Sequence, residues 1–115
     1  GHDGSAGTIH ANSAAEVPAR LAALGALGGL SGPALAAQVA ASIHVVIGVR
    51  RGHDGRRHVA EIGVVTTTRD AAGLDIRVEP AWALGAGDAE TTAGRKVLNS
   101  LLRNRRPATA SAEAR

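Results

Sequence analysis

Apolar residues recur at every third or fourth position in two stretches of the first half of the chain, as they do on the buried face of a helix. The first stretch predicts a helix over residues 14–27, with an apolar face made of Val17, Leu21, Leu24 and Leu27. The second predicts a helix that starts near Pro33, with an apolar face made of Leu35, Val39 and Ile43. Ser13 and Glu16 have the spacing of a capping box, so we expect them to cap the first helix.

Runs of β-branched residues follow the second predicted helix. Residues 45–49 and 58–65 form two such runs, and the dipeptide Asp54-Gly55 between them favours a tight turn. The three features together predict a β-hairpin. Residues 74–78 alternate between apolar and polar side chains, which predicts an outer antiparallel strand with Gly73 in the turn before it.

The last third of the chain has a weaker pattern. Residues 85–94 are loop-like, and residues 95–103 could form one amphipathic helix on Val97, Leu98, Leu101 and Leu102. Residues 107–115 have the composition of a disordered tail. We therefore expect two units: a packed domain over residues 1–84, and a loop, basic helix and tail over residues 85–115.

The composition indicates one small domain with a core of small aliphatic side chains. Of the 115 residues, 44% are apolar, yet Trp82 is the only aromatic residue and there is no cysteine. Such a core buries little area per side chain, so we expect marginal stability unless another chain or segment completes it. No apolar run is long enough to cross a membrane, and the chain starts at Gly1 rather than Met. A cytoplasmic protein is expected, with Gly1 lying inside a longer polypeptide.

Several kinds of chemistry have no sequence support. The chain contains no GxxxxGK[ST] phosphate loop, so we do not expect it to bind ATP by itself. It contains no cysteine nucleophile and no GxSxG motif, which leaves covalent catalysis without a candidate. No metal site is expected, because metal-ligand spacing is absent among the five histidines, His2, His10, His44, His53 and His58.

Two clusters of cations could contact phosphate or an acidic partner. One is at the tip of the predicted hairpin and consists of Arg50, Arg51, Arg56 and Arg57. The other is in the predicted C-terminal helix and consists of Arg95, Lys96, Arg103, Arg105 and Arg106. A solvated turn and a solubilising terminus explain the same residues. Because no aromatic side chains lie between the cations for base stacking, we expect no nucleic-acid partner.

His10 is the residue in the chain most open to a functional interpretation. The segment Thr8–Ala11 follows several glycines and is predicted to form a short buried strand, which would make His10 a core residue with one backbone partner. The same strand would end at a polar turn and a helix start, where open α/β sheets bind ligands. Thr8, Asn12 and Ser13 could orient an imidazole or a water there. The residues alone leave both interpretations open.

In the order of its motifs, the chain resembles the C-terminal part of the secretion and pilus-assembly ATPases. These are the type II and type IV secretion motors, and the resemblance is strongest to the tight-adherence (Flp) pilus branch. It rests on "GHDGSAGTIHANSA", then "VPARLAALGALGGL", then "AAQVAASIHVVIGVRRGHDGRRHVAEIGVV", and covers residues 1–65. The first of these stretches is similar to the histidine box of that family.

The resemblance implies an α/β fold, namely the C-terminal half of a RecA-like core: a strand, two helices, a β-hairpin and an outer strand, followed by a short helix and a tail. It implies ATP and Mg²⁺ as cofactors. The implied partners are the other subunits of a homo-hexameric ring and an inner-membrane secretion platform, so that the protein would be cytoplasmic and peripheral to the inner membrane. His10 matches the histidine that lies near the γ-phosphate, and Thr8, Asn12 and Ser13 match the rest of the box.

One departure from the family limits what this chain could do alone. The phosphate loop, the acidic box and the Walker B segment, which lie upstream of the histidine box in the family, are absent from these 115 residues. The first functional hypothesis is therefore a motor fragment that is inactive alone and couples ATP hydrolysis to pilin assembly or secretion when joined to its phosphate-loop half. The second is a non-catalytic interaction module that docks through the arginine hairpin and the basic C-terminal helix.

Overall fold

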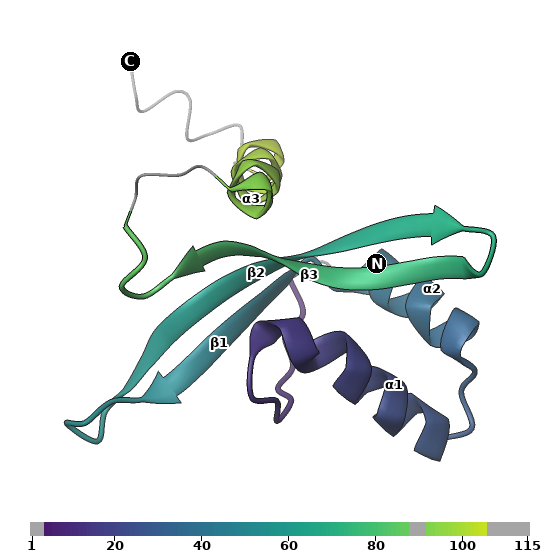
Figure 1. Ribbon diagram of the computed structural model, residues 1–115, viewed down its shortest axis with the longest axis horizontal. Helices are drawn as coiled ribbons and strands as arrows, with labels where there is room; N and C mark the ends of the chain where they lie inside the picture. The colour runs from purple at the N-terminus through teal and green to yellow at the C-terminus, as the bar shows by residue number, and fades with distance from the viewer. Residues whose placement is uncertain (1–3, 88–91, 106–115) are drawn as a thin grey trace.

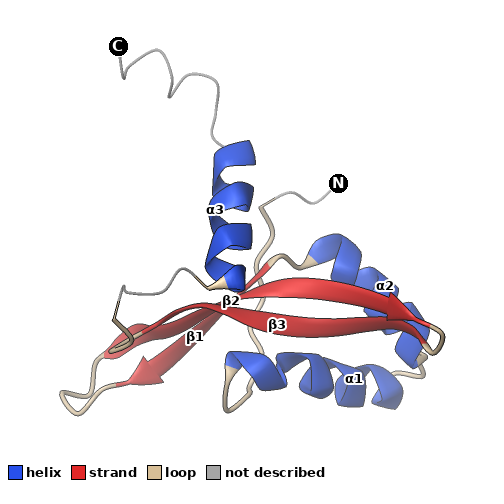
Figure 2. Cartoon of the chain, turned by 45° about the horizontal axis from the view of Figure 1, so that its top comes forward, coloured by secondary structure: helices blue, strands red, loops and turns tan. Residues whose placement is uncertain are grey.

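The fold is a three-stranded antiparallel sheet with helices on both faces. A computed structural model describes residues 4–87 and 92–105 (Figure 1). In chain order the elements are a 3₁₀ turn η1 (Ala14–Glu16), α1 (Val17–Leu27), α2 (Gly32–Ser42), β1 (Val45–Arg51), β2 (Arg57–Asp70), β3 (Gly73–Ala83) and α3 (Ala93–Asn104). The strand order is β1-β2-β3, so β1 and β3 are the edges. Helices α1 and α2 lie on one face of the sheet and α3 lies on the other (Figures 1 and 2).

The two predicted N-terminal helices are confirmed, although the first one begins differently. Ser31 caps α2, because its Oγ accepts a hydrogen bond from the N–H of Ala34 at 3.3 Å. The predicted capping box of Ser13 and Glu16 does not form, because neither side chain binds the backbone group that the motif requires. The side chain of Ser13 caps nothing, while Glu16 Oε2 accepts from the N–H of Asn12 at 3.3 Å. The turn that leads into α1 is held instead by a hydrogen bond from the N–H of Ala14 to Glu61 on β2.

The predicted hairpin is confirmed, and its second strand is longer than expected. At the tip, the N–H of Gly52 donates to the carbonyl of Arg56 at 2.8 Å, and Gly55 has a φ of 77°, which glycine adopts without strain. Beyond the predicted end at Val65, β2 continues to Asp70 because three threonines, Thr66, Thr67 and Thr68, pair with β3. The outer strand is confirmed as β3.

The buried core consists of small aliphatic side chains, as the composition predicts. Its members are Ala14, Val17, Val39, Val64 and Ala81, and Val64 has no exposed surface. Among the residues that the structure describes, eight larger apolar side chains remain exposed, including Ile47, Val49 and Leu102. A core of this size stabilises a domain only modestly, because the hydrophobic contribution scales with the apolar area removed from water.

Helix α3 is the amphipathic helix predicted near the end of the chain. Thr92 caps it by accepting from the N–H of Arg95 at 3.1 Å, and the Thr92 hydroxyl donates to the carbonyl of Pro80 at 2.8 Å. Gly94 is buried against the backbone of β3. The helix therefore packs on the same sheet as the rest of the chain. The predicted division at residues 84 and 85 stays a prediction, and the tail predicted over 107–115 lies outside the described residues.

The predicted strand over Thr8–Ala11 is wrong. These residues form an irregular segment, and only Ile9 is even half-buried. The physical reason is that a strand needs a neighbour to bind its backbone groups, and in the described part of the chain each strand pairs only within the sheet of β1, β2 and β3. The architecture is mixed α/β with antiparallel pairing; its RecA-like origin remains a hypothesis.

Candidate functional site

The candidate site predicted from the sequence is the segment of residues 7–13, which we call the histidine segment. It leads into η1 at the side of the sheet that α1 and α2 cover. The side chains of Thr8, His10 and Asn12 are exposed, and Ser13 is half-buried. The interpretation of His10 as a core histidine is therefore wrong. Among the described residues, His10 makes no hydrogen bond or ion pair, which leaves both ring nitrogens available.

The histidine segment is held at its C-terminal end by two carboxylates. Glu16 binds the N–H of Asn12 from within the first helical turn. Glu61, on the central strand β2, accepts from the N–H of Ala14 through Oε1 at 2.8 Å. A negative charge at the start of a helical turn also interacts favourably with the unpaired N–H groups there. The four predicted site residues are thus brought near one another by chain continuity, and the end of their segment is fixed by the sheet.

One glycine in the sheet, Gly48, makes room for this contact, and a second, Gly63, lies beside the turn. Gly48 on β1 pairs with Glu61, and a Cβ at Gly48 would lie 2.9 Å from Glu61 Oε1, closer than side chains allow. Gly63 on β2 faces Ala14, whose Cβ would be 3.6 Å from a Cβ at Gly63. The sequence indicated these residues only as members of strands. No local pattern could have shown that they underlie the turn after His10.

The histidine segment does not enclose a nucleotide by itself. The side chains of Thr8, His10 and Asn12 are exposed. None of the four predicted site residues lines the cavity that lies between α1, α2 and β3. The chain also has no phosphate loop to supply backbone N–H groups to a β-phosphate. ATP and Mg²⁺ therefore do not fit the residues present here as a complete site. In the part of the chain that the structure describes, no group of three metal-ligating side chains could hold a metal ion.

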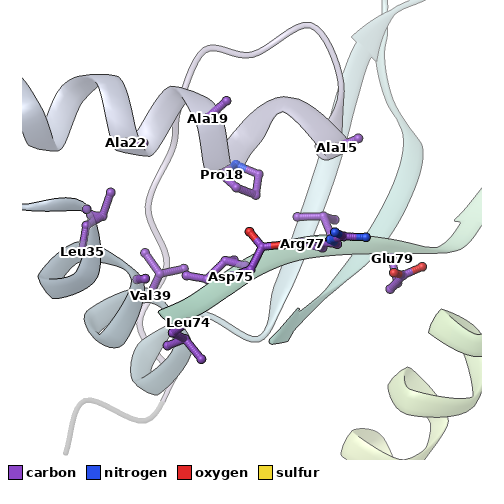
Figure 3. A pocket seen from close by; sticks show the side chains of 14 residues that line it. Ala15, Pro18, Ala19, Ala22, Leu35, Val39, Leu74, Asp75, Arg77 and Glu79 are labelled. Atoms are coloured by element: carbon purple, nitrogen blue, oxygen red, sulfur yellow. Dashed lines mark hydrogen bonds and ion pairs between the residues drawn. The ribbon is translucent and has the colours of Figure 1, made fainter. Parts of the chain in front are cut away.

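A cavity lies between the two N-terminal helices and the edge strand β3. Its volume is about 590 Å³, and it is partly open to solvent. Figure 3 shows Pro18 and Ala19 of α1 above it, Leu35 and Val39 of α2 beside it, and β3 along its floor. Its charged side chains include Asp75 and Arg77, which form an exposed ion pair at 3.0 Å. Sequence reasoning missed this cavity, although the alanines on the inner faces of α1 and α2 were a signal that the helices leave space.

The arginine hairpin is an exposed arm of the sheet. Arg51 is held in place by its donation from Nη1 to the carbonyl of Gly55 at 2.9 Å, and Asp54 accepts from the N–H of Arg56. The apolar residues next to these arginines are also exposed: Ile47 to 58% and Val49 to 56%. Val59, which pairs with Val49, is exposed as well. The sequence predicted these β-branched residues as strand positions without assigning them to a buried or an exposed face, so their exposure is a finding of the structure.

Comparison with known proteins connects the chain to proteins named for conjugal transfer. It is similar to two curated proteins of Mycobacterium tuberculosis, one from strain CDC 1551 / Oshkosh and one from strain ATCC 25618 / H37Rv, each named "Putative conjugal transfer protein". In both cases the identity is 46% over 105 residues, which is 91% of this chain. The chain spans only 28% of the length of each relative.

The remaining comparisons add no further likeness. No family model matches the chain, and no solved structure matches it. Within residues 4–87 and 92–105, the helices are too short or too polar to cross a bilayer. The similarity to the two mycobacterial proteins is therefore the finding from comparison that bears on function.

Proposed function

We propose that this chain is the C-terminal part of the motor domain of a secretion or pilus-assembly ATPase of the type II and type IV secretion class, with His10 at the edge of its nucleotide site. Joined to a phosphate-loop half, it would couple ATP hydrolysis to protein secretion or pilin assembly. The partners in this proposal are other subunits of a hexameric ring and a platform in the inner membrane.

The observation that carries the proposal is the exposed His10 in a segment with the motif order of a histidine box. The side chain is free of other described residues, and the turn after it is fastened to the sheet by Glu61. The name of the two mycobacterial relatives, which refers to conjugal transfer, supports a secretion-related role. The exposed edge strand β1 and the exposed apolar residues support packing against further polypeptide.

A His10→Ala substitution tests the proposal in a polypeptide that carries the phosphate-loop half upstream of Gly1. We expect kcat for ATP hydrolysis, measured by phosphate release, to fall by about a hundredfold, because removing one preorganised hydrogen-bonding group from a reacting centre costs roughly that much or more. His44→Ala is the matched control, since the His44 side chain is exposed and its backbone carbonyl, which binds the N–H of Val65, is unchanged.

One outcome would count against this function, and a second would count against the need for a phosphate loop in nucleotide binding. Hydrolysis by the His10→Ala variant at the parent's rate would remove the role assigned to His10. Micromolar binding of ATP and Mg²⁺ to the 115-residue chain alone, measured by calorimetry, would show that this chain binds the nucleotide without a phosphate loop, whereas we expect no binding.

A second candidate function is a non-catalytic interaction module that docks through the arginine hairpin and α3. The exposure of Ile47, Val49 and Val59 beside the four arginines favours it. Arg51 pairs with Arg57 two residues beyond the pair Val49 and Val59, so both pairs lie on one face of the hairpin. The surface would suit an acidic protein segment that carries apolar side chains.

The docking surface can be tested with a synthetic peptide of alternating glutamate and leucine residues. We expect the 115-residue chain to bind this peptide. The double variant Arg51→Glu and Arg57→Glu should bind it at least about tenfold more weakly, because the new carboxylates would repel the glutamates of the peptide. The double variant Arg69→Glu and Arg77→Glu carries the same charge change on β2 and β3 outside the hairpin tip and should bind as the parent does. Equal losses in both variants would indicate a non-specific charge effect.

A further inference from the structure

We infer that Glu61 is a positioning residue, which fastens the histidine segment to the sheet and ties its position to the β1–β2 hairpin. The anchoring itself rests on the contacts in this chain. Its significance for hydrolysis rests on the proposed function, because only there does His10 act on a nucleotide.

The anchor is a single long-range hydrogen bond to the turn after His10. Glu61 Oε1 accepts from the N–H of Ala14 at 2.8 Å, although the two residues are 47 positions apart in the sequence. The contact is partly buried, and Ala14 is only 6% exposed. A hydrogen bond to a charged acceptor in such surroundings contributes more than one in water, and its loss would leave the N–H of Ala14 without its partner.

The sheet is shaped to aim Glu61 at this N–H group. The Glu61 side chain lies across Gly48, its cross-strand partner, where a Cβ would contact its Cγ. The strand register shifts between Gly48 and Val49, and such a bulge re-aims neighbouring side chains. Gly63, two residues further along β2, lies beside Ala14, but a Cβ there would be in ordinary contact with Ala14 and would meet Val78 of β3 instead. Glycine at position 48 is therefore needed for Glu61 to reach the histidine segment in this conformation.

The anchor also lies at the base of the arginine hairpin. Gly48 is two residues before Arg50, and Glu61 is four residues after Arg57, so the strands that hold the anchor continue into the hairpin tip. A partner that bends the hairpin would displace Glu61, and with it the turn at Ala14. The structure thus provides a mechanical connection between an exposed cationic arm and the segment that carries His10.

Amide hydrogen exchange of the 115-residue chain, followed by NMR, tests the anchor. In Glu61→Ala we expect the N–H of Ala14 to exchange at least about tenfold faster, because the lost bond is worth at least about 1.4 kcal/mol. Glu61→Gln keeps a carbonyl oxygen at the same position and should restore most of the protection. Asp75→Ala, which removes an exposed carboxylate from β3, is the control and should leave Ala14 unchanged.

The exchange of the Val64 amide separates anchoring from general destabilisation. Val64 is fully buried in the centre of β2, so its amide exchanges through larger openings of the fold. Faster exchange at Ala14 with unchanged exchange at Val64 supports the inference. An equal acceleration at both positions, or no change at Ala14 in Glu61→Ala, would overturn it.

The effect of the anchor on function is measured as ATP hydrolysis by the longer polypeptide, which carries the phosphate-loop half upstream of Gly1. We expect Glu61→Ala to lower kcat by about tenfold with KM unchanged, and Glu61→Gln to recover activity, because the substitution misplaces His10 without removing it. If Glu61→Ala frees the N–H of Ala14 but neither it nor His10→Ala affects hydrolysis, the anchor stands and the proposed function fails. If His10→Ala lowers kcat and Glu61→Ala does not, the positioning role fails and the proposed function stands.

Discussion

A Gly94→Ala variant is expected to lose the packing of α3 on the sheet. The Cβ of an alanine at this position would meet the backbone of β3: the carbonyl oxygen of Pro80 directly, the carbonyl carbon of Pro80 at 2.8 Å and the oxygen of Glu79 at 2.9 Å. Backbone atoms of a paired strand cannot move aside as the end of a flexible side chain can. The helix must therefore retreat, which also disturbs the contact of Thr92 with Pro80.

We expect the variant to be destabilised by about 1–3 kcal/mol, the usual cost of overpacking a tight contact. Urea denaturation followed by the fluorescence of Trp82, the single tryptophan, measures this change. Gly87→Ala is the matched control, because a Cβ there has no atom within 4 Å, and its free energy of unfolding should change by less than about 0.5 kcal/mol. Equal stability of Gly94→Ala and the parent would show that α3 contributes little to the fold.

The second large effect is expected for Val64→Asp. Val64 is the one described core side chain with no exposed surface, and the buried side chains of the described residues include no polar or charged group that could pair with a new carboxylate. Burying an unpaired charge there should cost about 4 kcal/mol or more, which is a large share of the stability of a small domain. We expect circular dichroism to show a largely unfolded chain at neutral pH.

A variant on the same strand controls for the added charge. Thr67→Asp places the carboxylate at an exposed position of β2, paired with Ile76, and should remain folded. If Val64→Asp unfolds at the same urea concentration as the parent, the packing of α3 over the centre of the sheet would not exclude water, contrary to the structure.

The elements that the sequence predicted well are those whose signals are local. Helix α2 begins where Ser31 and Pro33 indicated, and the hairpin turns at Asp54-Gly55. The amphipathic helix α3 formed where its apolar positions recur. In each case, the residues that decide the conformation lie within a few positions of one another, so their pattern is visible in the chain.

The histidine segment shows where this reasoning fails. Its apolar and β-branched residues predicted a buried strand, but a strand requires a neighbour that the local sequence cannot indicate. Similarly, Glu61 appeared only as a polar residue in a strand, and its bond to Ala14 spans 47 positions. The cavity beside β3 and the exposed Ile47 and Val49 also depend on how the elements pack.

By itself, the sequence determined the order and type of the elements from α1 to α3, the small-aliphatic character of the core, and the motif order that makes His10 the leading functional candidate. The tertiary structure alone decided that His10 is exposed, that the turn after it is held by Glu61, and that Gly48 makes room for that contact. The physical reason is that helix caps, turns and periodicity act over a few residues, whereas the position of a functional segment depends on contacts between strands far apart in the chain.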